Sequence, residues 1–153
     1  MMPEMPFTIK ETRKMISSSK EISEKNRERI LQLHKIREAL FGPNDVEKSN
    51  FVKWAGFDEE LTIKVAEFFY DGMYKRQKLT QRERELCAIA ALTATRAEKQ
   101  LRTHIRAARN VGASQEEIGE VIFQMIAYAG MPAFVNAMDI AYDIFCAEDA
   151  ENG

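Results

Sequence analysis

Two proton-handling side chains near the middle of the chain, Glu85 and His104, are the residues most suited to chemistry. His104 shares a helical face with Leu101, Ile105 and Ala108, so its imidazole should point inward and need a hydrogen-bond partner. Glu85 lies at the edge of an apolar helical face, where its carboxylate can be drawn inward. A carboxylate paired with an imidazole can exchange protons near neutrality and act as a general acid and base.

The elements that would bring these two residues together are a pair of helices, expected at about Gln81–Thr95 and Ala97–Val111. The connection around Arg96 is very short, so the two helices should be antiparallel neighbours. Glu85 can then approach His104 across the pair. The residues alone also allow a satisfied core histidine without function and an ordinary surface carboxylate at position 85.

Arginines near these residues offer candidate anchors for an anionic substrate. Arg84 lies about 100° around the helix from Glu85, which makes it a candidate carboxylate clamp, although a surface salt bridge fits equally well. Arg102, Arg106 and Arg109 form a basic stripe. Arg102 and Arg106 lie about 200° from His104, so the stripe is expected to face solvent or another subunit.

The remaining reactive side chains carry little signal. His34 lies in a highly charged helix and is expected at the surface. Cys87 and Cys146 give neither a disulfide framework nor a metal-ligand spacing, and free cysteines on apolar helices are usually buried. Phosphate-binding glycine loops, zinc motifs and serine-nucleophile motifs are absent, so no cofactor and no metal are expected.

Helical periodicity runs through the whole chain and leaves no convincing strand. Capping boxes are expected at Ser18 with Glu21, Thr80 with Glu83 and Ser114 with Glu117. The sequence therefore predicts an all-α bundle of about seven helices, with the last four forming the core. The expected helices are about Ile22–Leu40, Asn44–Ala55, Glu59–Lys75, Gln81–Thr95, Ala97–Val111, Gln115–Ala129 and Pro132–Cys146.

Size and composition limit the class of protein. The 153 residues are 45% apolar and carry a formal net charge of −2, which suits one core and gives no electrostatic footprint for nucleic acid. No export signal or membrane span is recognised, and two cysteines suit a reducing cytoplasm. We expect an N-terminal helical arm at residues 1–57 that packs on a neighbouring subunit, a domain at 58–146 and a frayed tail at 147–153.

Three segments in order, LRTHIRAARNVG, SQEEIGEV and YAGMPAFVNA, resemble the carboxymuconolactone decarboxylase family within the alkyl hydroperoxidase D-like fold. The resemblance covers about Asp58–Phe145. It implies an all-α fold with a central helical hairpin, assembled as a homo-oligomer, either a trimer or a hexamer. The decarboxylase branch releases carbon dioxide from a carboxylated muconolactone without a cofactor.

From the residues and this resemblance together, the first hypothesis is a cofactor-free lyase acting on a small carboxylated, lactone-like molecule. His104 would be the general acid and base, Glu85 would orient it, and Arg84 would anchor the substrate carboxylate. Glu85 stands where a small hydroxylic residue is expected in many decarboxylases of the family, so the resemblance does not fix the exact substrate.

The peroxidase branch of the same fold gives the second hypothesis, an antioxidant activity on hydroperoxides. That branch has a glutamate and a histidine at the positions of Glu85 and His104, but its two cysteines fall at Ala97 and Gln100 here. The two-cysteine mechanism is therefore excluded, which leaves Cys87 or an unrecognised route. A third hypothesis is a non-catalytic helical oligomer that binds a small molecule.

Overall fold

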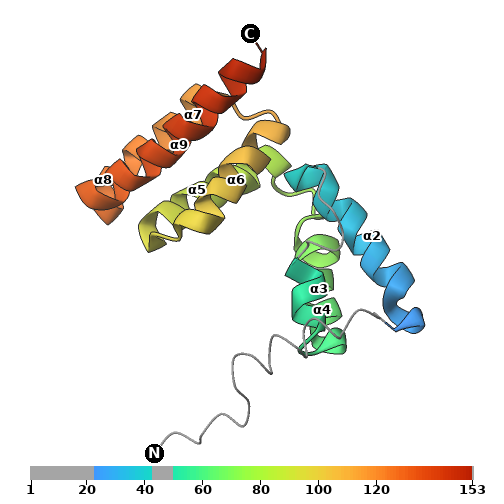
Figure 1. Ribbon diagram of the computed structural model, residues 1–153. Coiled ribbons are helices and arrows are strands. Elements are labelled where there is room, and N and C mark those ends of the chain that lie inside the picture. The colour runs from blue at the N-terminus through green and yellow to red at the C-terminus, as the bar shows by residue number, and fades with distance from the viewer. Residues whose placement is uncertain (1–22, 43–49, 153) are drawn as a thin grey trace, which may run out of the picture. The chain divides into compact units, whose positions relative to one another are not determined.

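The computed structural model describes residues 23–42 and 50–152, and every regular element within these two ranges is a helix (Figure 1). The all-α class predicted from the sequence is thus confirmed. The chain divides into two compact units, described separately here. The larger unit holds residues 76–152 together with Leu40–Gly42, and the smaller unit holds the other described residues. None of the described helices is long and apolar enough to cross a lipid bilayer.

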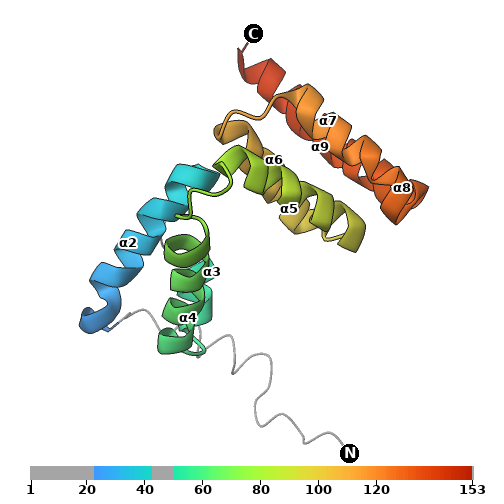
Figure 2. The same ribbon diagram turned by 180° about the vertical axis from the view of Figure 1, so that it is seen from behind.

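A bundle of four long helices forms the larger unit. These are α5 (Gln81–Thr95), α6 (Glu98–Asn110), α7 (Gln115–Gln124) and α9 (Met131–Asn152). In both views α5 lies beside α6 and α7 beside α9, and contacts between α5 and α7 and between α6 and α9 join the two pairs (Figures 1 and 2). The last four predicted helices therefore form the core, as expected from the sequence.

The core of this bundle combines branched side chains with alanines. Small alanines let neighbouring helices approach closely, and the isoleucines fill the space that remains between them. The buried set is Ile89, Leu101, Ile105, Ala108, Ala113, Ile118, Ile122, Ala137, Ile140, Ala141 and Ile144.

Two capping boxes fix where α5 and α7 begin. The Thr80 hydroxyl accepts from the backbone N–H of Glu83, and the Glu83 carboxylate accepts from the backbone N–H of Thr80. Ser114 and Glu117 repeat this arrangement at the start of α7. Each box satisfies two backbone donors that a helix start leaves free, which is why both helices begin where the sequence predicts.

The turn between α5 and α6 is made by a residue in the left-handed region. Arg96 has φ 56°, and its backbone N–H donates to the carbonyls of Leu92 and Thr93. Ending α5 in this conformation reverses the chain within two residues. The antiparallel pair predicted from the short connection is therefore present.

In the larger unit, two helices differ from the expectation by more than one residue. The helix predicted at 115–129 is interrupted at Met125, after which a short α8 (Ile126–Ala129) ends at Gly130 with φ 79°. The last helix runs to Asn152, six residues beyond its expected end at Cys146. No proline or glycine marks position 125, and nothing in the residues after Cys146 stops a helix.

The smaller unit contains α2 (Glu24–Phe41, up to Ala39), α3 (Asn50–Ala55), α4 (Glu59–Ala66) and a π-helical stretch η2 (Glu67–Met73). Leu33, Phe51 and Ala66 form its small core. The single helix expected over Glu59–Lys75 is thus two elements. Gly72, a residue with low α-helix propensity, lies in the π-helical part. The predicted Ser18 capping box and residues 44–49 of the second expected helix lie outside the described residues.

The predicted division into an arm (1–57), a domain (58–146) and a tail (147–153) stays a prediction. The two compact units follow other boundaries. Helices α3 and α4 pack together in the smaller unit, although the predicted boundary between residues 57 and 58 lies between them.

Candidate active site

The α5–α6 pair brings Glu85 and His104 into contact. Glu85, Ile89 and Thr93 are the buried residues of α5 and recur every four positions, so they share the face that turns toward the core. His104 lies between Leu101 and Ala108 on the inner side of α6. Because the helices run antiparallel from the turn at Arg96, these two positions face each other across the pair.

A short hydrogen bond joins the two side chains, with His104 Nδ1 2.7 Å from Glu85 Oε2. Glu85 is completely buried, and its other oxygen, Oε1, has no hydrogen-bond partner among the described residues. A buried carboxylate that loses water and gains one partner interacts strongly with that partner, because little else offsets its charge. Glu85 therefore holds the imidazole in one orientation.

His104 connects this buried carboxylate to the surface, since 21% of its side chain is exposed. Its second ring nitrogen, Nε2, makes no hydrogen bond to any described residue. With Nδ1 engaged by Glu85, Nε2 is the nitrogen left to give a proton to a small molecule or to take one from it.

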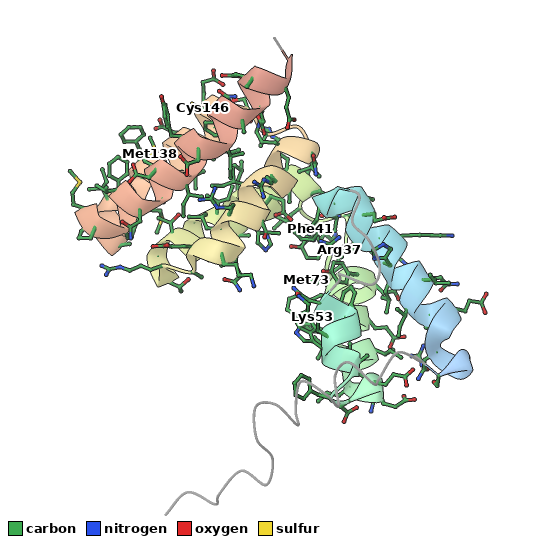
Figure 3. All side chains as sticks on the ribbon, in the orientation of Figure 1. Arg37, Phe41, Lys53, Met73, Met138 and Cys146 are labelled. Atoms are coloured by element: carbon green, nitrogen blue, oxygen red, sulfur yellow. The ribbon has the colours of Figure 1, made fainter. Side chains whose placement is uncertain are left out.

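A third side chain touches the pair from outside the two helices. This residue is Phe41, which is labelled in Figure 3. Its ring meets the imidazole of His104 edge to face, with centroids 5.3 Å apart and planes at 86°. Phe41 belongs to the segment Leu40–Gly42, which groups with the larger unit although it is distant in sequence. Sequence reasoning missed this residue. The apolar periodicity of the first helix was followed only as far as Leu40. No local sequence signal marks a contact between Phe41 and His104, which are far apart in the chain.

Arg84 is not brought to the pair. Its Nη2 donates a hydrogen bond to the backbone carbonyl of Arg76 at 3.0 Å, and it makes no hydrogen bond to Glu85 or His104. The role predicted for Arg84 as a carboxylate anchor stays a prediction, because the anchor would have to release this contact or use its remaining donors.

Two arginines of the basic stripe form ion pairs with α9. Arg102 Nη2 lies 3.5 Å from Asp143, and Arg109 Nε donates to Glu148 at 2.8 Å while its Nη1 donates to the carbonyl of Ala113 at 2.7 Å. Such half-exposed ion pairs contribute little stability each. Their effect is to orient α9 along α6, which the sequence pattern does not show.

Three sequence-based expectations about reactive residues were wrong. His34 is buried instead of exposed, with Nε2 3.2 Å from a carboxylate oxygen of Glu38, because it follows Leu33 on the inner side of α2. Cys87 and Cys146 are both exposed. Each lies two residues from a buried one, Glu85 and Ile144, and two residues are about 200° around a helix, so both cysteines point outward.

A family model described as the carboxymuconolactone decarboxylase family matches residues 59–143, more than half of the chain. The chain belongs to the carboxymuconolactone decarboxylase family. The match includes Glu85 and His104 and excludes Phe41. The family resemblance predicted from the three sequence segments is confirmed.

Two relatives extend this result. The 4-carboxymuconolactone decarboxylase of Acinetobacter baylyi is 30% identical over 118 residues, which cover 77% of this chain and 87% of that protein. An uncharacterized 15.0 kDa protein of Paracoccus denitrificans is 38% identical over 87 residues, which cover 56% of this chain and 65% of that protein, just under two thirds of its length. The chain is thus similar to one protein with a named activity and to one without.

Proposed function

We propose that this member of the carboxymuconolactone decarboxylase family is a cofactor-free lyase that decarboxylates a small, carboxylated, lactone-like substrate. The observation that carries the proposal is the 2.7 Å contact between a completely buried Glu85 and a partly exposed His104. A purely structural histidine would bury both ring nitrogens against partners, whereas Nε2 here has no described partner.

In the proposed reaction the bond between the substrate ring carbon and its carboxylate breaks, and carbon dioxide leaves. The electron pair of that bond stays on the substrate and spreads into the adjoining unsaturated lactone. His104 Nε2–H then delivers a proton to carbon, and the imidazole regains a proton from water. One carboxylate and one proton are consumed, and one carbon dioxide and one decarboxylated product are formed.

Glu85 and Arg84 have the other roles in the proposed reaction. Glu85 lies too deep to touch a substrate, so its part is to hold Nδ1 and to keep the ring oriented during the transfer. Arg84 is assigned to the substrate carboxylate, which it would bind by releasing the Arg76 carbonyl or through its remaining donors.

The test uses the full chain with 4-carboxymuconolactone as the probe and follows carbon dioxide release. His104→Ala should lower kcat by about 10²-fold or more, the usual effect of removing a general acid. Arg84→Gln should raise KM more than it lowers kcat, because it removes a binding contact. The matched control is His34→Ala, since His34 is the other histidine and lies outside the larger unit.

Wild-type protein that binds the probe without turning it over would overturn the lyase proposal and favour a binding protein. Consumption of an alkyl hydroperoxide that is lost on replacing both Cys87 and Cys146 would favour the antioxidant alternative instead.

The same proposal includes a homo-oligomer, a trimer or a hexamer, in the cytoplasm. Aromatic and aliphatic side chains on α8 and α9 remain exposed, among them Tyr128, Met131, Val135 and Tyr142. Large exposed apolar groups of this kind are typical of subunit interfaces. Both thiols are free in the structure, as a reducing compartment would keep them.

A further inference from the structure

Phe41 is the one described ring that contacts the His104 imidazole. It lies 18 positions before the first residue of the family match, which begins at residue 59. The contact therefore joins a segment outside the matched region to the central pair.

One hydrogen bond alone leaves a histidine ring incompletely fixed. The terminal torsion of a histidine has two broad minima about half a turn apart, and a half turn exchanges the positions of Nδ1 and Cδ2. Glu85 binds the ring at Nδ1, whereas Phe41 packs edge to face against it at a centroid distance of 5.3 Å. A preferred aromatic geometry at the ring, added to the hydrogen bond, restricts that rotation.

The backbone next to Phe41 is also fixed against α6. Gly42 has φ 80°, and a Cβ atom at this position would lie 3.1 Å from Asn110 Nδ2 at the end of α6. On the other side of Phe41 in the sequence, Leu40 is buried and only 5% exposed. Phe41 is therefore flanked by a buried side chain and by a close backbone approach, so its ring is held in place instead of resting loosely on the surface.

We propose that Phe41 is a positioning residue for His104, which keeps Nδ1 on Glu85 and leaves Nε2 as the reacting nitrogen. Its ring also covers part of the imidazole and so keeps water from competing for the hydrogen bond to Glu85. This inference rests on the proposed lyase function for its kinetic consequence, but its structural consequence can be measured without any substrate.

The first experiment records imidazole nitrogen spectra of the full-length, nitrogen-15-labelled protein, in which protonated and unprotonated ring nitrogens are distinguished. The chain has only two histidines, so His34→Gln assigns the signals and His34 serves as the internal reference in the Phe41 variants. Wild-type His104 should show one predominant protonation pattern. Phe41→Leu should give mixed populations at His104 and an unchanged His34, and Phe41→Tyr, which keeps the ring, should restore the wild-type pattern.

The second experiment measures kcat and KM with 4-carboxymuconolactone. Phe41→Leu should lower kcat about tenfold with little change in KM, less than the roughly 10²-fold cost of misplacing a catalytic group by a full ångström. Phe41→Tyr should recover most of the activity. Phe57→Leu, which removes an exposed ring in the smaller unit, is the matched control and should leave both constants unchanged.

The two experiments separate the proposals. If the wild type does not turn over the probe, the lyase function fails and the nitrogen spectra alone decide the role of Phe41. A Phe41→Leu protein that is folded by circular dichroism and has wild-type His104 spectra overturns the inference, as does wild-type kcat in that variant. Loss of the single His104 pattern with rescue by Phe41→Tyr supports it.

Discussion

Glu85 is the residue whose surroundings decide what His104 can do. Its carboxylate is removed from water, one oxygen faces the imidazole at 2.7 Å, and the other has no described partner. A surface carboxylate at the same distance would be screened by water and would orient the ring weakly. Burial of one partner and exposure of the other thus produce a histidine that is fixed on one side and free to react on the other.

Replacing Glu85 by Gln should lower kcat by about 10- to 100-fold, the usual loss when a partner that orients a functional histidine is removed. An amide can either accept from Nδ1 or donate to it, so the ring loses its preferred protonation pattern as well as the adjacent negative charge. Steady-state kinetics with 4-carboxymuconolactone measure the effect. Glu120→Gln removes an exposed carboxylate on α7 and should have no effect; equal losses in the two variants would contradict the role of Glu85.

The same pair should be visible in stability. His104→Ala leaves a buried carboxylate with no partner, which costs about 1–3 kcal/mol of unfolding free energy. Adding Glu85→Gln to that variant removes the buried charge, so the double variant should be less destabilised than the sum of the two single changes by about 1 kcal/mol or more. Urea unfolding of the four proteins completes the cycle. Simple additivity would show that the contact carries no coupling.

How far the site was predictable depends on the range of each contact. Glu85 and His104 could be paired because the helices that carry them are consecutive and the turn at Arg96 is short. Their distances in sequence from this turn predict that they face each other across the helix pair. Phe41 could not be found this way, because it reaches His104 from a distant part of the chain. Burial of His34 was missed for the related reason that charged neighbours in sequence do not show which side of α2 faces the small core.

At the scale of the helices, the local sequence signals that predict structure lie mostly at the helix ends. Thr80 donates to the Glu83 carboxylate through its backbone N–H at 2.7 Å and its hydroxyl at 2.8 Å, and these hydrogen bonds hold the pKa of Glu83 below its ordinary value. Both helices that start with such a box begin at the predicted residue. Interior features, namely the break at Met125 and the π-helical stretch from Glu67, were not predicted, because the packing that produces them is not a local signal.

Glu83→Gln should lower the midpoint temperature of unfolding at pH 7, and the difference from wild type should shrink as the pH falls below about 4. Because the folded state binds the Glu83 proton more weakly than the unfolded state, the stabilisation is complete above the ordinary pKa. It is lost as the pH falls through the lowered one. Thermal unfolding followed by circular dichroism from pH 2 to pH 7 measures this. A difference that does not change with pH would contradict the assignment.

Buried alanines on α9 let this helix pack closely in the core of the bundle. Ala137 is 1% exposed, and Ala137→Leu should lower the unfolding free energy by about 1–3 kcal/mol, because a well-packed core accommodates extra methylenes only by shifting. Ala147→Leu makes the same change at an exposed position of the same helix and should cost little. Urea unfolding compares the two; equal costs would show that α9 does not pack tightly at Ala137.

At the scale of the whole molecule, the family match and the compact units divide the chain differently. The match begins with α4 and η2, which group with the smaller unit, and it leaves out Phe41, which groups with the larger one. The contact between Phe41 and His104 therefore means that the matched region does not contain every residue that shapes its own central pair. A truncated protein that starts at residue 59 would keep Glu85 and His104 and lose this contact.

Assembly of several subunits is expected to cover the exposed apolar side chains of α9. Met131, Val135 and Tyr142 recur at offsets of four and seven, so they line one side of the helix and remain 44–69% exposed. The wild type should sediment as a trimer or a hexamer of the 17.6 kDa chain, and Val135→Lys should shift it toward the monomer, because the interface would bury an unpaired charge.

Analytical ultracentrifugation over a range of concentrations makes this measurement, with Ala94→Lys, a change at an exposed position on α5, as the charge-matched control. A monomeric wild type would remove the oligomer from the proposal and leave the Glu85–His104 pair to act within one chain. A Val135→Lys protein that keeps the wild-type sedimentation would place the interface on another face. If Val135→Lys dissociates the assembly and kcat falls with it, the activity depends on the assembly.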